Sequence, residues 1–95
     1  MTITYRVGGD LDVDDVIEVY RESTLADRPL DDRERMGRML ENASVTVTAW
    51  DGEKVVGIAR SITDWNYCTY LSDLAVRKSH QRQGIGSALD RKSVV

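Results

Sequence analysis

Two glycines two positions apart, Gly84 and Gly86, separate an apolar stretch that ends at Val76 from a second apolar stretch. The pattern predicts a strand, a short polar loop and a helix that begins near Gly84. The first N–H groups of a helix have no partner within it, and aligned peptide dipoles add partial positive charge there. Basic side chains surround the loop: Arg77, Lys78, His80 and Arg82. These features favour binding of a phosphate or pyrophosphate group.

The loop also carries a recognisable motif. Residues 81–86 read Gln-Arg-Gln-Gly-Ile-Gly, with Leu-Ala-Val before the loop and Ser-Ala-Leu after it. This stretch resembles the Gln/Arg-x-x-Gly-x-Gly/Ala motif of the GCN5-related N-acetyltransferases (GNAT), in which the loop cradles the pyrophosphate of acetyl-CoA. The resemblance implies acetyl-CoA as the cosubstrate. It implies these cofactor-binding residues: Leu74, Ala75, Val76, Gln81, Arg82, Gln83, Gly84, Ile85, Gly86 and Ser87.

Acetyl transfer to an amine needs a held thioester, a polarised carbonyl and a base that removes a proton. The resemblance implies that backbone groups of residues 74–76 bond the pantetheine as a neighbouring strand would, and that the Val76 N–H could polarise the acetyl carbonyl. Asp73 is the candidate general base, because acids on this strand serve as bases in some members of the family. The alternative, which we favour, is a carboxylate at a bulge that hydrogen-bonds nearby backbone.

Other reactive side chains receive simpler interpretations. The usual general acid of the family is a tyrosine on the helix after the fifth strand, and none of the four tyrosines here matches that position. Trp65, Tyr67 and Tyr70 could line an acceptor site, but packing in the core or at the sheet edge is favoured. His80 is interpreted as a solvated loop residue and Cys68 as a small buried side chain. No metal site is predicted.

Alternating apolar residues, many of them β-branched or aromatic, predict four strands. They lie at residues 3–7, 45–50, 55–62 and 67–76. Asp51-Gly52 is a strong turn signal, so the second and third strands should form a hairpin. In the last strand Leu71 falls on an odd position, whereas Leu74 and Val76 fall on even ones. A bulge at Ser72-Asp73 would bring these residues to one face, and the family resemblance supports it.

Three helices are predicted between and after the strands. Asp12 can cap the first, and Asp31 or Asp32 can cap the second, which ends near Asn42. Residues 24–29 connect these two. An apolar stripe on the second helix predicts core residues: Met36, Met39 and Leu40. With the helix near Gly84, the order is β-α-α-β-β-β-α. The expected fold class is α+β (α/β), a partial GNAT fold with a mixed, mostly antiparallel sheet flanked by helices, in a single domain of residues 1–95.

The length, composition and net charge of the chain indicate the class of protein to which it belongs. The chain has 95 residues and a net charge of −3, with 41% hydrophobic and 31% charged residues, as is typical of one small globular domain. The acidic balance does not favour nucleic acid as a partner. A single cysteine forms no internal disulfide, and no apolar run is long enough to span a membrane. A cytoplasmic protein without a membrane partner is expected.

The predicted function is transfer of acetyl from acetyl-CoA to a small amine or peptide acceptor. The GNAT resemblance implies a fifth strand and a fourth helix after this chain, so the domain is expected to be truncated. The alternative is therefore an inactive fragment that binds CoA or only associates with another chain. A different phosphate binder is disfavoured, because no Gly-Lys-Ser/Thr follows the glycines and Leu89 replaces the third glycine of Gly-x-Gly-x-x-Gly.

The strand at residues 67–76 is expected at the edge of the sheet when no fifth strand lies beside it. Edge strands present unpaired N–H and C=O groups that recruit another chain. A homodimer or higher oligomer is therefore predicted, paired through this strand or through the face around Leu89, Val94 and Val95. The alternative is a partly unfolded monomer, because so short a chain has little core in reserve.

Overall fold

The computed structural model describes residues 2–23, 25 and 27–93. Its elements are β1 (Ile3–Val7), α1 (Val13–Arg21), α2 (Arg33–Glu41), β2 (Val45–Asp51), β3 (Lys54–Thr63), β4 (Thr69–Val76), the 3₁₀ helix η1 (Lys78–His80) and α3 (Ile85–Lys92). The predicted order of strands and α-helices is confirmed, and η1 is an addition to it. The predicted connection at residues 24–29 includes Thr24 and Ala26, which lie outside the described residues.

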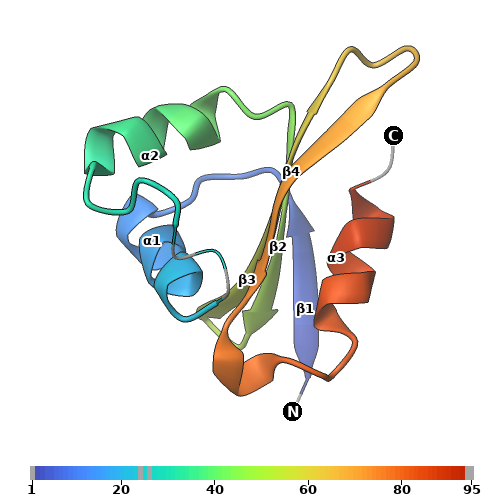
Figure 1. Cartoon of the computed structure of the whole chain (residues 1–95). Coiled ribbons are helices and arrows are strands. Elements are labelled where there is room, and N and C mark those ends of the chain that lie inside the picture. The colour runs from blue at the N-terminus through green and yellow to red at the C-terminus, as the bar shows by residue number, and fades with distance from the viewer. Residues whose placement is uncertain (1, 24, 26, 94–95) are drawn as a thin grey trace.

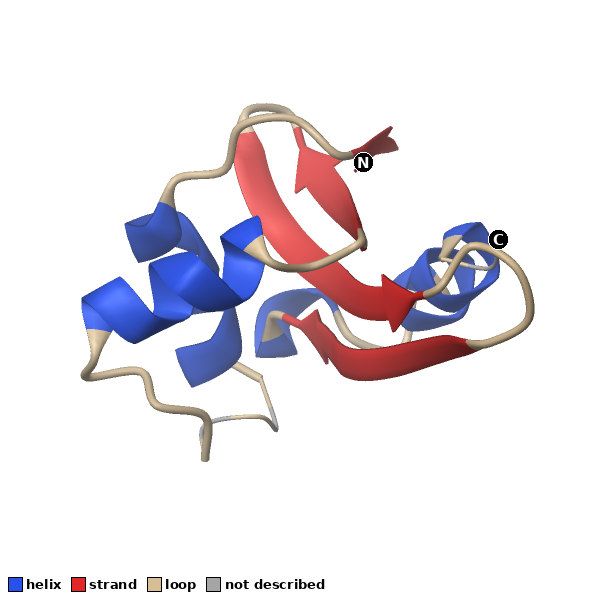
Figure 2. Cartoon of the chain, turned by 90° about the horizontal axis from the view of Figure 1, so that it is seen from above, coloured by secondary structure: helices blue, strands red, loops and turns tan. Residues whose placement is uncertain are grey.

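The strands form one sheet in the order β1-β2-β3-β4, and each neighbouring pair is antiparallel. The described sheet is therefore antiparallel throughout rather than mixed. Helices α1 and α2 lie on one side of it and α3 lies on the other, as Figures 1 and 2 show. β4 is an edge strand in this sheet, so one side of its backbone faces away from β3.

The first two helices begin at the predicted aspartates. The Asp12 carboxylate accepts a hydrogen bond of 2.9 Å from the Asp14 N–H, and the Asp32 carboxylate accepts one of 3.0 Å from the Arg35 N–H. Asn42 ends α2, as predicted. Met36 is fully buried, and Met39 and Leu40 pack against the same cluster, so the apolar stripe of α2 is confirmed as part of the core.

The core consists of two apolar clusters, one on each face of the sheet. The cluster under α1 and α2 includes Tyr20 and Ile58, and the cluster under α3 includes Val56 and Leu89. Gly57 allows α3 to approach β3 closely, because a Cβ there would lie 3.0 Å from Leu89 Cδ1 and 3.3 Å from the Ala75 carbonyl oxygen. This close approach brings the beginning of α3 to the end of β4.

The predicted bulge in β4 is confirmed. Arg60 pairs with Asp73 and the next residue of β3, Ser61, pairs with Leu71, so Ser72 is an extra residue in β4. The bulge places Leu71 on the α3 face together with Leu74 and Val76. It also turns the Asp73 side chain toward α1, where Tyr20 donates a hydrogen bond to it.

The β3–β4 hairpin corrects two predictions. It projects beyond the helices (Figure 1), so Cys68 is exposed and not buried, and Trp65 and Tyr67 are 61% and 95% exposed rather than packed in the core. Tyr70 is also largely exposed. The Asp64 carboxylate accepts hydrogen bonds from three backbone N–H groups at the hairpin tip, which lowers its pKa to about 2.

Of the helices that the structure describes, none is long and apolar enough to cross a membrane.

Candidate functional site

The free edge of β4 presents backbone groups next to the glycine loop. The Val76 carbonyl faces away from β3, because it accepts a hydrogen bond of 3.0 Å from Gln81 Nε2. The following residue, Arg77, points the other way and donates its N–H to the Val56 carbonyl at 2.8 Å. Since residues alternate in direction along an antiparallel ladder, the N–H groups of Leu74 and Val76 both face the free edge. A ligand laid along this edge would meet them as it would a neighbouring strand.

The loop that follows β4 ends in an open turn. Gly84 adopts a φ of 81° and caps α3, and no heavy atom lies within 4 Å of the position that a Cβ would take. The Ala88 N–H donates to the Gly84 carbonyl at 3.0 Å, as the first helical hydrogen bond. The N–H groups of Ile85, Gly86 and Ser87 precede it and have no acceptor within the helix. The turn therefore offers backbone donors and helix-dipole charge in an open position.

The structure contradicts the prediction that Arg77 is a free basic side chain at the loop. Arg77 is almost fully buried, and its Nη1 donates to the Glu18 carboxylate at 2.6 Å and also to Glu22, while its Nε donates to the Val55 carbonyl at 2.7 Å. The hydrogen bond and charge of Arg77 lower the pKa of Glu18. Arg77 thus ties the end of β4 to α1, and Lys78 and Arg82 are the exposed cations at the loop.

His80 is likewise engaged rather than solvated. Its Nε2 lies 3.0 Å from an Asp51 carboxylate oxygen, and its Nδ1 lies 2.8 Å from Ser79 Oγ. Because Asp51 ends β2, this contact ties η1 to the β2–β3 turn. The prediction of a solvated loop histidine is therefore wrong, and the imidazole holds the loop in place.

Asp73 is buried on the α1 face of β4, with 1% of its surface exposed. Its carboxylate accepts hydrogen bonds from Arg60 Nε at 2.6 Å, Arg28 Nε at 2.8 Å and the Tyr20 hydroxyl at 2.9 Å. Burial alone would raise the pKa of Asp73, but the hydrogen bonds from Arg60, Arg28 and Tyr20 outweigh it and lower that pKa. The partners are side chains rather than the backbone groups that we expected.

Tyr20 is held by the same contact. Burial, and then the negative charge of Asp73, raise the pKa of its hydroxyl well above the ordinary tyrosine value. Arg28 also reaches the bulge, because its Nη2 donates to the Ser72 carbonyl at 3.2 Å. The four side chains, Tyr20, Arg28, Arg60 and Asp73, form what we call the Asp73 cluster. It joins α1, the α1–α2 connection, β3 and the β4 bulge.

Comparison with known proteins identifies the family of this chain. Residues 12–93 match the family model described as the acetyltransferase (GNAT) family. The chain belongs to this family. Its fold is that of a GNAT family acetyltransferase from Streptococcus pneumoniae, with a TM-score of 0.77 and 31% identity over 96% of this chain and 64% of that one. No curated protein sequence matches it significantly.

Two further solved structures share the GNAT fold of this chain. A protein of unknown function from methicillin-resistant Staphylococcus aureus is 28% identical, with a TM-score of 0.77 over 94% of this chain and 65% of that one. The PaiA N-acetyltransferase from Thermoplasma acidophilum, solved in complex with coenzyme A, is 16% identical, with a TM-score of 0.72 over 97% and 69% of the two chains. This GNAT chain therefore spans about two thirds of the length of these proteins.

The structure places the predicted cofactor-binding residues of the GNAT motif together. The edge of β4 and the first turn of α3 lie side by side, with a Cβ on Gly86 only 3.9 Å from Val76 Cγ2. Ala75 and Ile85 are the exceptions, because both are almost fully buried and the Ala75 backbone pairs with Ile58 of β3. Tyr20, Arg28 and Arg60 were not predicted. A signal for Arg60 was present, because an arginine inside the apolar strand at residues 55–62 needs a buried partner.

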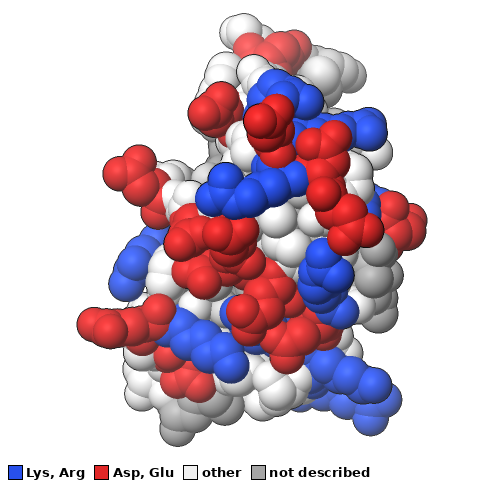
Figure 3. Space-filling model, turned by 90° about the vertical axis from the view of Figure 1, so that its left-hand side faces the viewer, with Lys and Arg blue, Asp and Glu red and all other residues white. Residues whose placement is uncertain are grey.

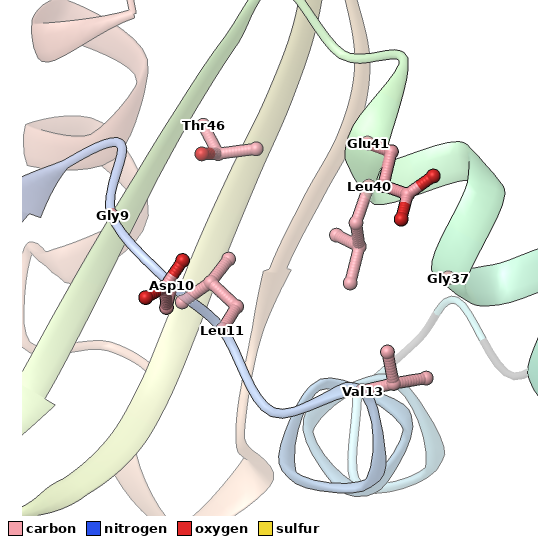
Figure 4. Close-up of a pocket in the computed structure, with 8 residues that line it drawn as sticks. All are labelled: Gly9, Asp10, Leu11, Val13, Gly37, Leu40, Glu41 and Thr46. Carbon is pink, nitrogen blue, oxygen red and sulfur yellow. The ribbon is translucent and has the colours of Figure 1, made fainter.

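A hollow of about 280 Å³ lies between the β1–α1 connection, α2 and β2, away from the edge of β4 and the first turn of α3 (Figure 4). Leu11, Val13 and Leu40 point into it, and Asp10 and Glu41 lie at its sides. It includes no residue of β4, the loop or α3, so it is not part of the candidate GNAT site. Within the described residues, no group of three or more His, Cys, Asp or Glu side chains could hold a metal ion.

Proposed function

We propose that this chain binds acetyl-CoA along β4 and at the first turn of α3, as part of an N-acetyltransferase that acts on an amine. The observation that carries the proposal is the continuity between the free edge of β4 and the open turn at Gly84. The N–H groups of Ile85, Gly86 and Ser87 would hold the pyrophosphate, with Lys78 and Arg82 adding positive charge. The coenzyme A complex of the Thermoplasma acidophilum neighbour supports the same ligand class.

The pantetheine arm would run from the loop back along the edge of β4. There the N–H groups of Leu74 and Val76 are available, and either could donate to the acetyl carbonyl and stabilise the oxyanion that forms on attack by the amine. Asp73 as the general base stays a prediction. A carboxylate that already accepts three hydrogen bonds and has a lowered pKa is a weak base, so its contacts favour a role in holding Arg28 and Arg60.

Acetyl-CoA binding can be tested by titrating the ¹⁵N-labelled chain and following its backbone amide signals. We expect the largest shifts at Leu74, Val76 and residues 84–87, because these N–H groups would contact the ligand. Shifts confined to the hollow of Figure 4, or no shifts at millimolar acetyl-CoA, would remove the proposed site.

The second candidate function is a module that binds CoA without catalysing acetyl transfer. We therefore expect the 95-residue chain to transfer acetyl groups poorly. The Tyr20 hydroxyl already donates to Asp73, and Tyr70 lies six residues from Val76 along β4, roughly 20 Å away. Neither of these two tyrosines is therefore placed to protonate the departing thiolate. A thiol-release assay with a panel of amines should give rates near background, whereas clear turnover would contradict this prediction.

We also propose that the chain forms a homodimer through the free edge of β4, where a second chain would compete with acetyl-CoA for the Leu74 and Val76 N–H groups, and that it resides in the cytoplasm. Leu89 is fully buried between α3 and the sheet, so the prediction of pairing through the face around it is wrong. The predicted contribution of Val94 and Val95 to that face lies outside the described residues. The exposed aromatic rings of the β3–β4 hairpin, Trp65 and Tyr67, are further apolar surface on the same strand pair. Light scattering coupled to gel filtration should give twice the 10.7 kDa chain mass, and a monodisperse folded monomer would contradict the dimer.

A further inference from the structure

A hollow of about 380 Å³ lies between α2 and the C-terminal half of β3. The residues that line it are Arg35, Arg38, Met39, Asn42, Arg60 and Ile62. Arg35 and Arg38 are three positions apart on α2, so their side chains share one face of the helix. We call this region the arginine hollow. It combines the positive charges of Arg35 and Arg38, and the guanidinium group of Arg60 that pairs with Asp73, with an apolar wall made by Met39 and Ile62.

The charge of Arg35 and Arg38 is not neutralised by the described part of the chain. Acidic and basic side chains are interspersed over the face that carries α1 and α2 (Figure 3), and other arginines pair with carboxylates, as Arg21 does with Asp31 and Arg33 with Asp14. Among the described residues, neither Arg35 nor Arg38 forms such an ion pair. Two adjacent free guanidinium groups in a chain of net charge −3 point to an anionic ligand.

Arg60 adds a buried donor to the same hollow. Only 8% of its surface is exposed, its Nε donates to Asp73, and its Nη2 donates to Ser72 Oγ at 2.9 Å. Its described hydrogen bonds use Nε and Nη2 and leave Nη1 for a ligand. A guanidinium group presents its N–H donors in a planar fork that matches the two oxygens of a carboxylate.

The arginine hollow lies within reach of the proposed acetyl site. Two residues that line the hollow, Arg60 and Ile62, pair with Asp73 and Tyr70 across the β3–β4 ladder, so the hollow lies one to four residues along β4 from the Leu74 N–H. One to four residues of a strand span roughly 3–13 Å. A molecule with a carboxylate in the hollow and an amine at the edge of β4 therefore needs an aliphatic body of about that length, which Met39 and Ile62 can contact.

We propose that the arginine hollow binds the carboxylate of the acetyl acceptor, so that the acceptor is an amine with an aliphatic body and a distant carboxylate. The role of the amine rests on the proposed function, whereas binding of the carboxylate does not. The matched probes are 6-aminohexanoate and 6-aminohexanamide, which share the amine and the chain and differ only in the charge of the far end.

Each probe is titrated into the ¹⁵N-labelled chain while the Nε–H signals of Arg35 and Arg38 are followed. We expect 6-aminohexanoate to shift these signals and to bind at least fivefold more tightly than the amide. The double variant Arg35→Gln, Arg38→Gln should bind both probes equally. Arg33→Gln, on the same helix but facing Asp14, should keep the preference of the unaltered chain. Because the substituted residues Arg33, Arg35 and Arg38 are all exposed, each variant should keep the native circular dichroism spectrum.

Equal affinity for the two probes would overturn the proposal, as would a preference that survives in the double variant. A parallel titration with acetyl-CoA, followed at the amides of residues 84–87, separates this result from the proposed function. Acetyl-CoA binding without a carboxylate preference keeps the proposed function and removes the carboxylate site. A carboxylate preference without acetyl-CoA binding keeps the carboxylate site and removes both the proposed function and the acceptor assignment.

Discussion

Replacing Gly84 with aspartate is expected to weaken acetyl-CoA binding by about 100-fold or more, which corresponds to about 2.7 kcal/mol. Gly84 is exposed and its φ of 81° lies in the left-handed region, where a side chain adds strain. The space around its Cβ position is open, so the aspartate side chain would occupy the place proposed for the pyrophosphate. Its negative charge would also oppose the favourable charge at the beginning of α3. Calorimetric titration of both proteins with acetyl-CoA measures the difference.

Gly9→Asp is the matched control for this change. Gly9 is also exposed, has a φ of 87° and has no heavy atom within 4 Å of its Cβ position, but it lies between β1 and α1. It should reproduce the strain and the added charge while leaving acetyl-CoA affinity within about twofold of the unaltered chain, a difference of roughly 0.4 kcal/mol. Equal losses in both variants would show that the loss at Gly84 does not come from the ligand site.

Asp73→Asn is expected to destabilise the fold by about 3–5 kcal/mol, because removal of one member of a buried ion pair leaves its partner charge uncompensated. Asp73 lies between Arg60 and Arg28, and its side chain is inaccessible to solvent. The uncharged amide would leave Arg60, which is itself nine-tenths buried, without a counter-charge. Urea unfolding of both proteins, followed by tryptophan fluorescence, gives the change in the free energy of unfolding.

Asp31→Asn is the control for the Asp73 variant. Asp31 pairs with Arg21 at 3.0 Å, but the two side chains are 98% and 54% exposed, so the loss should stay below about 1 kcal/mol. A loss at Asp73 no greater than the loss at Asp31 would mean that the Asp73 cluster does not stabilise the fold. The comparison separates burial from the mere presence of an ion pair.

The Asp73 cluster should make the free energy of unfolding depend on pH. The pKa of Asp73 is lower in the folded chain than its ordinary value, so its contribution is complete above about pH 4 and is lost as the pH falls further through the folded value. The free energy of unfolding of the unaltered chain should therefore fall below about pH 4 more steeply than that of Asp73→Asn. Parallel slopes would contradict the lowered pKa.

The order and most boundaries of the elements could be predicted from the sequence, because their causes act over a few residues. Asp12 and Asp32 cap helices through N–H groups two or three positions away, and Asp51-Gly52 closes a hairpin within one turn. The change of apolar phase between Leu71 and Leu74 permitted a bulge at Ser72-Asp73, and the GNAT resemblance supported that choice. The motif at residues 81–87 identified the loop, since its glycines and polar residues are contiguous.

The roles of the charged side chains were decided only by the tertiary structure. Arg77 reads as a loop cation in the sequence, yet it is buried against Glu18, 59 positions earlier in the chain. His80 reads as solvated, yet it lies against Asp51. Spacing along the chain carries no information about which distant carboxylate an arginine or histidine will meet, because that depends on how the helices cross the sheet.

The Asp73 cluster and the arginine hollow have the same origin. Tyr20 and Arg28 reach Asp73 from 53 and 45 positions away, and Arg35 and Arg60 come together only when α2 lies over β3. The sequence by itself determined the strands, the helices and the glycine turn, because local backbone preferences and apolar periodicity specify these. Packing in three dimensions decided which charges are buried, which are paired and which remain free for a ligand, because burial and ion pairing depend on contacts between distant segments.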